Sequence, residues 1–199
     1  VFDDNPVGLV KLVAALDVGG FSEALYASEE IHSSVQKAVE LLGLGSESLR
    51  LIPANARFQI DVRALRETVA EDGERGFAPF CVVGAAGATS TGAVDDMDAL
   101  ADFCAAQGLW LHVDGAFGAW AALAPEARRL VAGMERADSL ALDLHKWMYM
   151  PYDIGCVLVR READHRAAFS LTPDYLAHGA GGLRREAELR GLAGEQDRA

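Results

Sequence analysis

Long apolar runs and an excess of basic residues are both missing from this 199-residue chain. No stretch approaches the roughly 20 apolar residues that a membrane-spanning helix needs, and the N-terminus lacks the basic segment and apolar core of a secretory signal. Lysine and arginine number 18 against 30 aspartates and glutamates, a net charge of -12. This balance disfavours nucleic acid or an anionic membrane as the main partner. A small-molecule substrate fits better.

Cysteine is also scarce. Cys81, Cys104 and Cys156 lie in apolar runs, and no pair has the spacing of a CxxC motif. An odd number of such residues predicts buried, reduced thiols in a cytoplasmic protein and argues against a disulfide framework or a zinc site. The 51% hydrophobic content is sufficient for a sizeable core, and one α/β domain is the simplest interpretation.

Apolar runs of strand length alternate with helical patterns from Phe21 onward. Strands are expected at 25–27, 49–52, 79–83, 109–113, 139–142 and 155–159. Continuous apolar strands separated by amphipathic helices predict a mainly parallel sheet with helices on both faces. In such sheets the ligand binds at the carboxyl ends of the strands.

Three helices can be placed between these strands. The first carries Val35, Ala38, Val39 and Leu42 on one face, with Ser33 or Ser34 as its cap and Gly43 at its end. The second opens at Asp61 and closes at Gly73. The third shows Met97, Leu100, Ala101 and Cys104 on one face, with Asp95 and Asp96 expected in its first turn, where acidic side chains suit the helix dipole.

Polar residues follow three of the expected strands. These segments are His112–Ala116, Asp143–Trp147 and the glycine-rich run Gly84–Thr91. A lysine beside a buried strand, such as Lys146, is costly to hide unless it is neutral or paired. That cost becomes tolerable if the amine forms an imine with an aldehyde cofactor.

A pyridoxal imine needs several partners, and the sequence offers a candidate for each. Asp114 could keep the pyridinium nitrogen protonated, while His32 could cover one face of the ring. Ala116 is small enough to allow close approach on the other face. The loop Gly87–Thr91 offers hydroxyl and backbone N–H groups to a phosphate.

Three segments together carry a resemblance to a known family. They are SEEIHSSVQKA (28–38), HVDGAFG (112–118) and LDLHKWMYMPYDIGCVLVR (142–160). They resemble the group II pyridoxal-dependent decarboxylases, which include aromatic-amino-acid, histidine and glutamate decarboxylases, and the similarity runs from about Tyr26 to about Leu176. The resemblance implies a fold-type-I large domain, pyridoxal 5'-phosphate as cofactor, decarboxylation of an amino acid, and a homodimer with a shared active site.

The resemblance also implies a role for each matching residue. Lys146 would form the Schiff base, Asp114 would pair with the pyridinium nitrogen, and His32 would stack on the ring. Ala116 would lie beneath the ring, Thr89 close to the cofactor, and Asp143 and His145 near the phosphate. Lys146, His32 and Asp114 are therefore the expected catalytic residues, and no metal is expected.

Family members continue beyond the similarity into a second, small domain. We therefore expect a truncated chain with an unplaced segment at 1–20, a partial cofactor-binding large domain at 21–176, and a polar tail at 177–199 in place of a small domain.

Other functions are compatible with the same residues. An aminotransferase or another lyase would use the same lysine and aspartate. A metal-dependent hydrolase could use His112, Asp114 and His145 as ligands, and a non-catalytic remnant of the family is a further alternative. His112 shares a strand face with Asp114 and is interpreted as a packing histidine, or one that supports a site residue without binding a ligand.

Overall fold

The protein is described by a computed structural model for residues 23–169. Six strands form one sheet in that range: β1 (Glu23–Ser28), β2 (Leu49–Ile52), β3 (Ala78–Ala85), β4 (Trp110–Asp114), β5 (Ser139–Asp143) and β6 (Gly155–Val159). Their order is β2-β1-β3-β4-β5-β6. The first five strands are parallel and β6 runs antiparallel to β5. The predicted α/β class and mainly parallel sheet are confirmed. The expectations for 1–20 and 177–199 lie outside the described residues.

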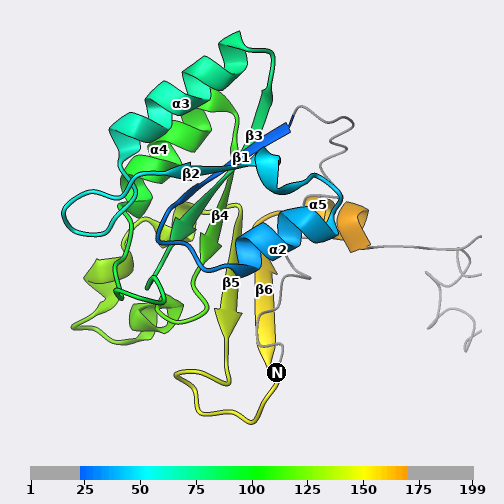
Figure 1. Ribbon diagram of the computed structural model, residues 1–199. Coiled ribbons are helices and arrows are strands. Elements are labelled where there is room, and N and C mark those ends of the chain that lie inside the picture. The colour runs from blue at the N-terminus through cyan, green and yellow to red at the C-terminus, as the bar shows by residue number, and fades with distance from the viewer. Residues whose placement is uncertain (1–22, 170–199) are drawn as a thin grey trace, which may run out of the picture. The chain divides into compact units, whose positions relative to one another are not determined.

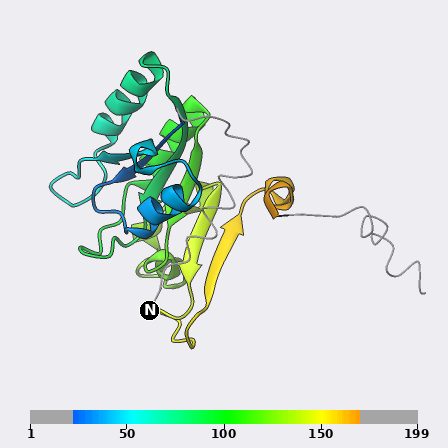
Figure 2. The same cartoon turned by 45° about the vertical axis from the view of Figure 1, so that its right-hand side comes forward.

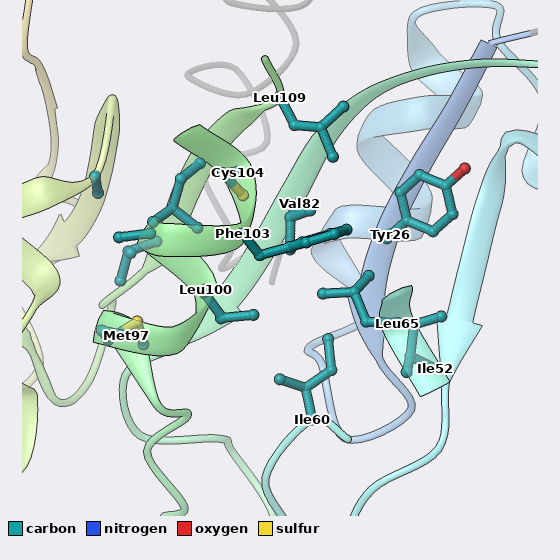
Figure 3. Close-up of a cluster of buried hydrophobic side chains, with 14 of the residues drawn as sticks. Tyr26, Ile52, Ile60, Leu65, Val82, Met97, Leu100, Phe103, Cys104 and Leu109 are labelled. Atoms are coloured by element: carbon teal, nitrogen blue, oxygen red, sulfur yellow. The ribbon is translucent and has the colours of Figure 1, made fainter. Parts of the chain in front are cut away.

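Helices cover the two faces of the sheet unequally (Figure 1). Helices α3 (Val62–Glu74) and α4 (Met97–Gln107) pack on one face, and α2 (Ser34–Leu41) packs on the other. Neighbouring residues in a strand point to opposite faces, so Tyr26 and Val82 belong to the first core and Leu25 and Val83 to the second. Figure 3 shows the first core, where Leu65 of α3 and Leu100 of α4 meet the sheet.

The predicted helix starts differ in how well they match the structure. Asp61 caps α3 as expected, because its carboxylate accepts from the backbone N–H groups of Arg63 and Ala64. Ser33 occupies the N-cap position of α2 as predicted, but its side chain makes no capping hydrogen bond. The imidazole of His32 takes this role, since the Ser34 N–H donates to His32 Nδ1 at 3.2 Å.

The predicted helix ends and first turns also need two corrections. Gly73 does not close α3, which continues to Glu74; the reversal comes at Gly76, whose φ of +84° suits glycine. Asp95 is not in the first turn of α4. It precedes the helix and is buried, and its carboxylate accepts from the N–H groups of Ile60 and Ala85, both at 2.7 Å. Asp95 therefore ties the end of β3 to the segment that enters α3.

Several elements escaped the sequence patterns. They are the short 3-10 helices η1 (Ser46–Ser48), η2 (Ala119–Leu123), η3 (Arg128–Val131) and η4 (Met134–Arg136), and the helix α5 (Glu162–Phe169). Short 3-10 segments have no long apolar period to detect. Within residues 23–169, no helix has the length and apolar character needed to cross a membrane.

The connection between β5 and β6 extends beyond the end of the sheet in both views (Figures 1 and 2). It spans residues 144–154, between the bounds of the two strands. Its first residues follow the carboxyl end of β5, next to the carboxyl ends of β3 and β4. The fold thus gathers the three polar segments predicted from the sequence at one edge of the sheet.

Candidate active site

A cavity of about 480 Å³ lies at this edge, on the face of the sheet that α2 covers. Its volume is typical of small-molecule sites. It is lined by Ile31, His32, Ser34, Val35, Ala38, Ala85, Gly87, Ala88, Thr89, Gly92, His112, Asp114, Ala116, Phe117, Ala141, Asp143, Lys146, Cys156 and Val157. Six of the seven residues singled out from the sequence are in this set. His145 is not.

Asp114 ends β4 and projects from the cavity face of the sheet. Its Oδ1 accepts from the Ala116 N–H at 3.2 Å. Burial raises the pKa of the Asp114 carboxyl, while the Ala116 hydrogen bond and the charges of Lys146 and His32 act in the opposite direction. A buried carboxylate that faces an open cavity is stabilised by a cation or an N–H donor. A protonated pyridinium nitrogen is both. The residue fits the cofactor that the sequence suggests.

Lys146 lies on the loop after β5, and its Nζ is 2.8 Å from Oδ2 of Asp143. Asp143 is itself fixed at the end of β5, since its backbone carbonyl accepts from Trp120 Nε1 at 2.9 Å. The tryptophan therefore supports the segment that carries the lysine. The ion pair keeps the Lys146 amine at the cavity wall, with one carboxylate close enough to exchange a proton with it.

His145 lies beside this pair and outside the cavity lining. Its Nε2 is 3.9 Å from Oδ2 of Asp143, and its ring stacks on Tyr152 with centroids 4.6 Å apart. The Ile154 N–H donates to its Nδ1 at 3.1 Å. His145 thus links the two ends of the 144–154 loop. Its predicted position near a phosphate stays a prediction.

His32 reaches the cavity from the start of α2. Because a backbone N–H can only donate, the bond from Ser34 N makes Nδ1 the acceptor. In the neutral form of the ring, the proton then lies on Nε2. The ring is held at the cavity by the same bond that caps the helix, so local helix formation and placement of the histidine are coupled.

The loop after β3 brings Thr89 to the cavity, but it uses many of its own N–H groups. Those of Gly87 and Ala88 donate to Ala93 O, and those of Thr91 and Gly92 donate to Ala88 O. A phosphate bound here would depend mainly on the Thr89 hydroxyl and on N–H groups nearby.

The loops after β3 and β4 are joined by close backbone contact. The Gly118 N–H donates to Ala86 O at 2.9 Å, and a Cβ at Gly118 would clash with that oxygen. A Cβ at Gly87 would lie 3.1 Å from Gly118 N. The glycines of the HVDGAFG and GAAGATST segments thus set the spacing between the loops that carry Ala116 and Thr89.

The metal-hydrolase alternative finds no support in the geometry. Within residues 23–169, no three His, Cys, Asp or Glu side chains are grouped closely enough to hold a metal ion. His112 and Asp114 share a face of β4, but the His145 ring is directed to Ile154 and Tyr152. The three proposed ligands do not form a set.

Some lining residues were missed by sequence reasoning. Ala141 is paired with Asp114 across the β4–β5 ladder, and Ser34, Phe117 and Cys156 also line the cavity. Ala141 could have been predicted from the two-residue period of a strand, because it lies two residues before Asp143 and so on the same face. Cys156 comes to the cavity because β6 runs antiparallel to β5. No local sequence pattern indicated that direction.

Comparisons with known proteins identify the family of this chain. The family model described as "Pyridoxal-dependent decarboxylase conserved domain" matches residues 22–191. The aromatic-L-amino-acid decarboxylase of Bacillus atrophaeus is 41% identical over 152 residues, which are 76% of this chain and 32% of that protein. The Bos taurus enzyme of the same name is 40% identical over 77% of this chain and 31% of its own. The chain therefore spans about a third of the length of these curated relatives.

Solved structures give the same result. Oryza sativa TDC, solved with PLP and tryptamine, has a TM-score of 0.80 and 33% identity over 88% of this chain and 39% of its own. The Catharanthus roseus tryptophan decarboxylase in complex with L-tryptophan has a TM-score of 0.78 and 29% identity, covering 87% of this chain and 39% of its own. The predicted resemblance and fold-type-I architecture are confirmed, and the chain belongs to the pyridoxal-dependent decarboxylase family.

Proposed function

We propose that this chain forms the cofactor-binding part of an enzyme that decarboxylates an amino acid with pyridoxal 5'-phosphate. The observation that carries the proposal is the convergence of three groups on one cavity: the amine of Lys146, the carboxylate of Asp114 and the imidazole of His32. They come from the β5–β6 loop, β4 and the start of α2. Groups that lie 114 residues apart in the chain (146 minus 32) meet only because the sheet assembles them.

Each residue has a physical task in this proposal. When bound, the cofactor supplies a ring that accepts the electron pair left as carbon dioxide departs. Asp114 would hold a proton on the ring nitrogen, Lys146 would supply the amine for covalent attachment, and Asp143, 2.8 Å from that amine, would accept or return its proton. His32 packs over the site from α2, and Ala116 leaves room opposite. Thr89 and the neighbouring loop offer the polar contacts for the phosphate.

The substrate class follows from the relatives. Several are named aromatic-L-amino-acid or tryptophan decarboxylases, which favours an aromatic amino acid. A relative from a Rosa hybrid cultivar, 32% identical over 78% of this chain, is named phenylacetaldehyde synthase. An aldehyde-forming reaction on the same cofactor is therefore the second candidate, with the aminotransferase and other lyases behind it.

The reaction can be tested by product analysis. We expect the protein supplied with pyridoxal phosphate and L-tryptophan to release one carbon dioxide for each amine formed. Release of carbon dioxide with aldehyde in place of amine would identify the second candidate. A keto acid product without carbon dioxide would indicate an aminotransferase, and no product from any aromatic amino acid would favour a non-catalytic remnant.

We also propose that the protein acts as a homodimer. Exposed apolar side chains follow one another along the 144–154 loop at Trp147, Met148, Tyr149 and Met150, and the Trp147 ring touches the exposed ring of Phe117, which lines the cavity, edge to face at 5.2 Å. An apolar surface of this kind is typical of a protein interface. A second copy covering it would exclude water from the cavity mouth.

The oligomer is open to direct measurement. The double variant Tyr149→Asp with Met150→Asp places two charges on this surface and is expected to shift the sedimentation coefficient to that of a monomer. Leu123→Asp on η2, where the side chain is 67% exposed, is the control and should sediment as the unmodified protein does. Equal behaviour of both variants would rule out this surface as the interface.

Two further expectations belong to this proposal. We infer that residues 21–176 form a partial large domain, because the cavity is built entirely from segments in that range. We also infer a cytoplasmic location, which the three free thiols favour. Fractionation of cells that express the protein would check the location.

A further inference from the structure

A row of three buried side chains lies behind the cavity. Trp110 and His112 are two residues apart on β4, and Ser139 of β5 is paired with His112 across the ladder. Trp110 Nε1 donates to Ser139 Oγ at 2.9 Å, and Ser139 Oγ is 2.7 Å from His112 Nδ1. All three are buried, so their hydrogen bonds are shielded from water and strongly directional.

The bond from Trp110 has one possible direction, and the need of the Ser139 hydroxyl for an acceptor favours one direction for the other bond. An indole N–H has no acceptor capacity, so Ser139 Oγ must be the acceptor from Trp110. The Ser139 hydroxyl has one hydrogen to give, and His112 is its other partner within residues 23–169. Donation to Nδ1 of His112 is the arrangement that gives this hydrogen an acceptor, and it leaves the proton of the neutral ring on Nε2. Burial lowers the pKa of His112 to about 4, so the ring stays neutral near pH 7.

The other ring nitrogen of His112, Nε2, differs from Nδ1 in its surroundings. His112 lines the cavity, although only 3% of its surface is exposed. In the described part of the chain, Nε2 has no hydrogen-bond partner; Ser139 is the only residue bonded to this ring. The cavity, which His112 lines, is where a ligand can supply an acceptor to this nitrogen, and a ligand that covered Nε2 without accepting from it would leave the donor unpaired, which is costly.

We propose that His112 donates from Nε2 to an oxygen acceptor of the ligand held in this cavity, and that Ser139 and Trp110 are positioning residues that fix its tautomer. Asp114, two residues further along the same face, lies about 6.6 Å away by strand geometry. The wall thus offers an acceptor at Asp114 and a donor at His112. It selects a ligand with a cationic or N–H group at one point and an oxygen at the other.

This inference rests on the proposed function for the identity of the ligand. The oxygen could belong to pyridoxal phosphate or to the amino acid that reacts with it. Both sources present the same chemistry to Nε2. Separate binding measurements for the two molecules distinguish them.

The tautomer can be measured without any ligand. In the full chain with 15N-labelled histidine, we expect the His112 signals of a ring protonated at Nε2. Ser139→Ala should give a mixture of the two tautomers, whereas Ser139→Thr, which keeps the hydroxyl, should restore the original signals. Ser48→Ala is the matched control, since Ser48 is a buried serine that donates to Leu44 O far from the row. A wild-type ring protonated at Nδ1 would overturn the proposal.

The donor role is tested by binding. Glutamine at position 112 keeps an amide N–H near the position of Nε2, whereas methionine fills similar volume without a donor. We expect His112→Met to bind pyridoxal phosphate, or L-tryptophan when loaded with it, about three- to tenfold more weakly, and His112→Gln to stay within about twofold of wild type. Weaker cofactor binding assigns the oxygen to the cofactor, and weaker amino-acid binding alone assigns it to the substrate.

Two results would count against these assignments in different ways. If His112→Met folds, by circular dichroism, and binds both molecules as tightly as wild type, Nε2 does not donate to either. If wild-type protein binds no pyridoxal phosphate, the proposed function fails. In that case the donor role toward this ligand fails with it, while the histidine spectra still decide whether Ser139 and Trp110 fix the tautomer.

Discussion

Lys146→Ala is expected to abolish covalent attachment of pyridoxal phosphate and to reduce turnover by at least about a thousandfold, since no other group can replace a nucleophilic amine. The 2.8 Å contact with Asp143 places this amine at the cavity wall. The measurement is borohydride reduction in the presence of the cofactor, followed by mass spectrometry of the peptide that contains residue 146. The wild-type peptide should gain the mass of one reduced cofactor and the variant peptide should not.

Two variants separate loss of the amine from loss of its charge. Lys146→Arg keeps a cation beside Asp143 but cannot form the covalent bond, so it should fold normally and remain unlabelled. Lys37→Ala removes an exposed lysine of α2 and should be labelled as wild type is. Labelling at Lys37 in place of Lys146 would remove the basis of the proposed function.

Acidification is expected to destabilise the fold through His112. Burial lowers its folded-state pKa to about 4, whereas an unfolded histidine titrates near 6.5. Between pH 4 and about pH 6.5, the His112 ring is protonated in the unfolded chain and neutral in the native state. The contribution of His112 to the free energy of unfolding is therefore fully present above about pH 6.5 and is lost as the pH falls to 4. A difference of two to three pKa units corresponds to about 3 kcal/mol in the free energy of unfolding.

Comparison with His112→Gln isolates this effect. Burial raises the pKa of Asp95 and of Asp114, so these groups act in the opposite sense, but they are present in both proteins. Urea unfolding at a series of pH values should show the stability of wild type falling relative to His112→Gln by about 3 kcal/mol between pH 7 and pH 4. Parallel stability curves would mean that the His112 ring is not held neutral by burial.

The sheet was largely predictable because its strands are continuous apolar runs. The expected strand at 155–159 matches β6, and 49–52 matches β2. The direction of β6 was not predictable, since an apolar edge strand has the same pattern whichever way it runs. The 3-10 segments between β4 and β5 were missed because their apolar residues follow no sustained period.

The candidate site was predictable where chemistry and strand ends coincide. Asp114 and Lys146 stood out as charged residues directly after apolar strands, and both line the cavity. The function of Ser139 could not be predicted, because a serine at the start of a strand is common. Its importance depends on the register that pairs it with His112. Likewise, Asp95 resembled a helix-dipole residue until the fold brought Ile60 and Ala85 to its carboxylate.

The antiparallel return of β6 has a consequence for the lysine. A parallel continuation would send the chain away from β5 through a crossover helix. The hairpin instead anchors the segment 144–154 in the sheet at both of its ends. Lys146 thus lies in a segment that is held by β5 three residues before it and by β6 on the other side. Little chain entropy remains to be lost when the amine engages a ligand, so the rigidity needed for a precise covalent contact is already present in the folded protein.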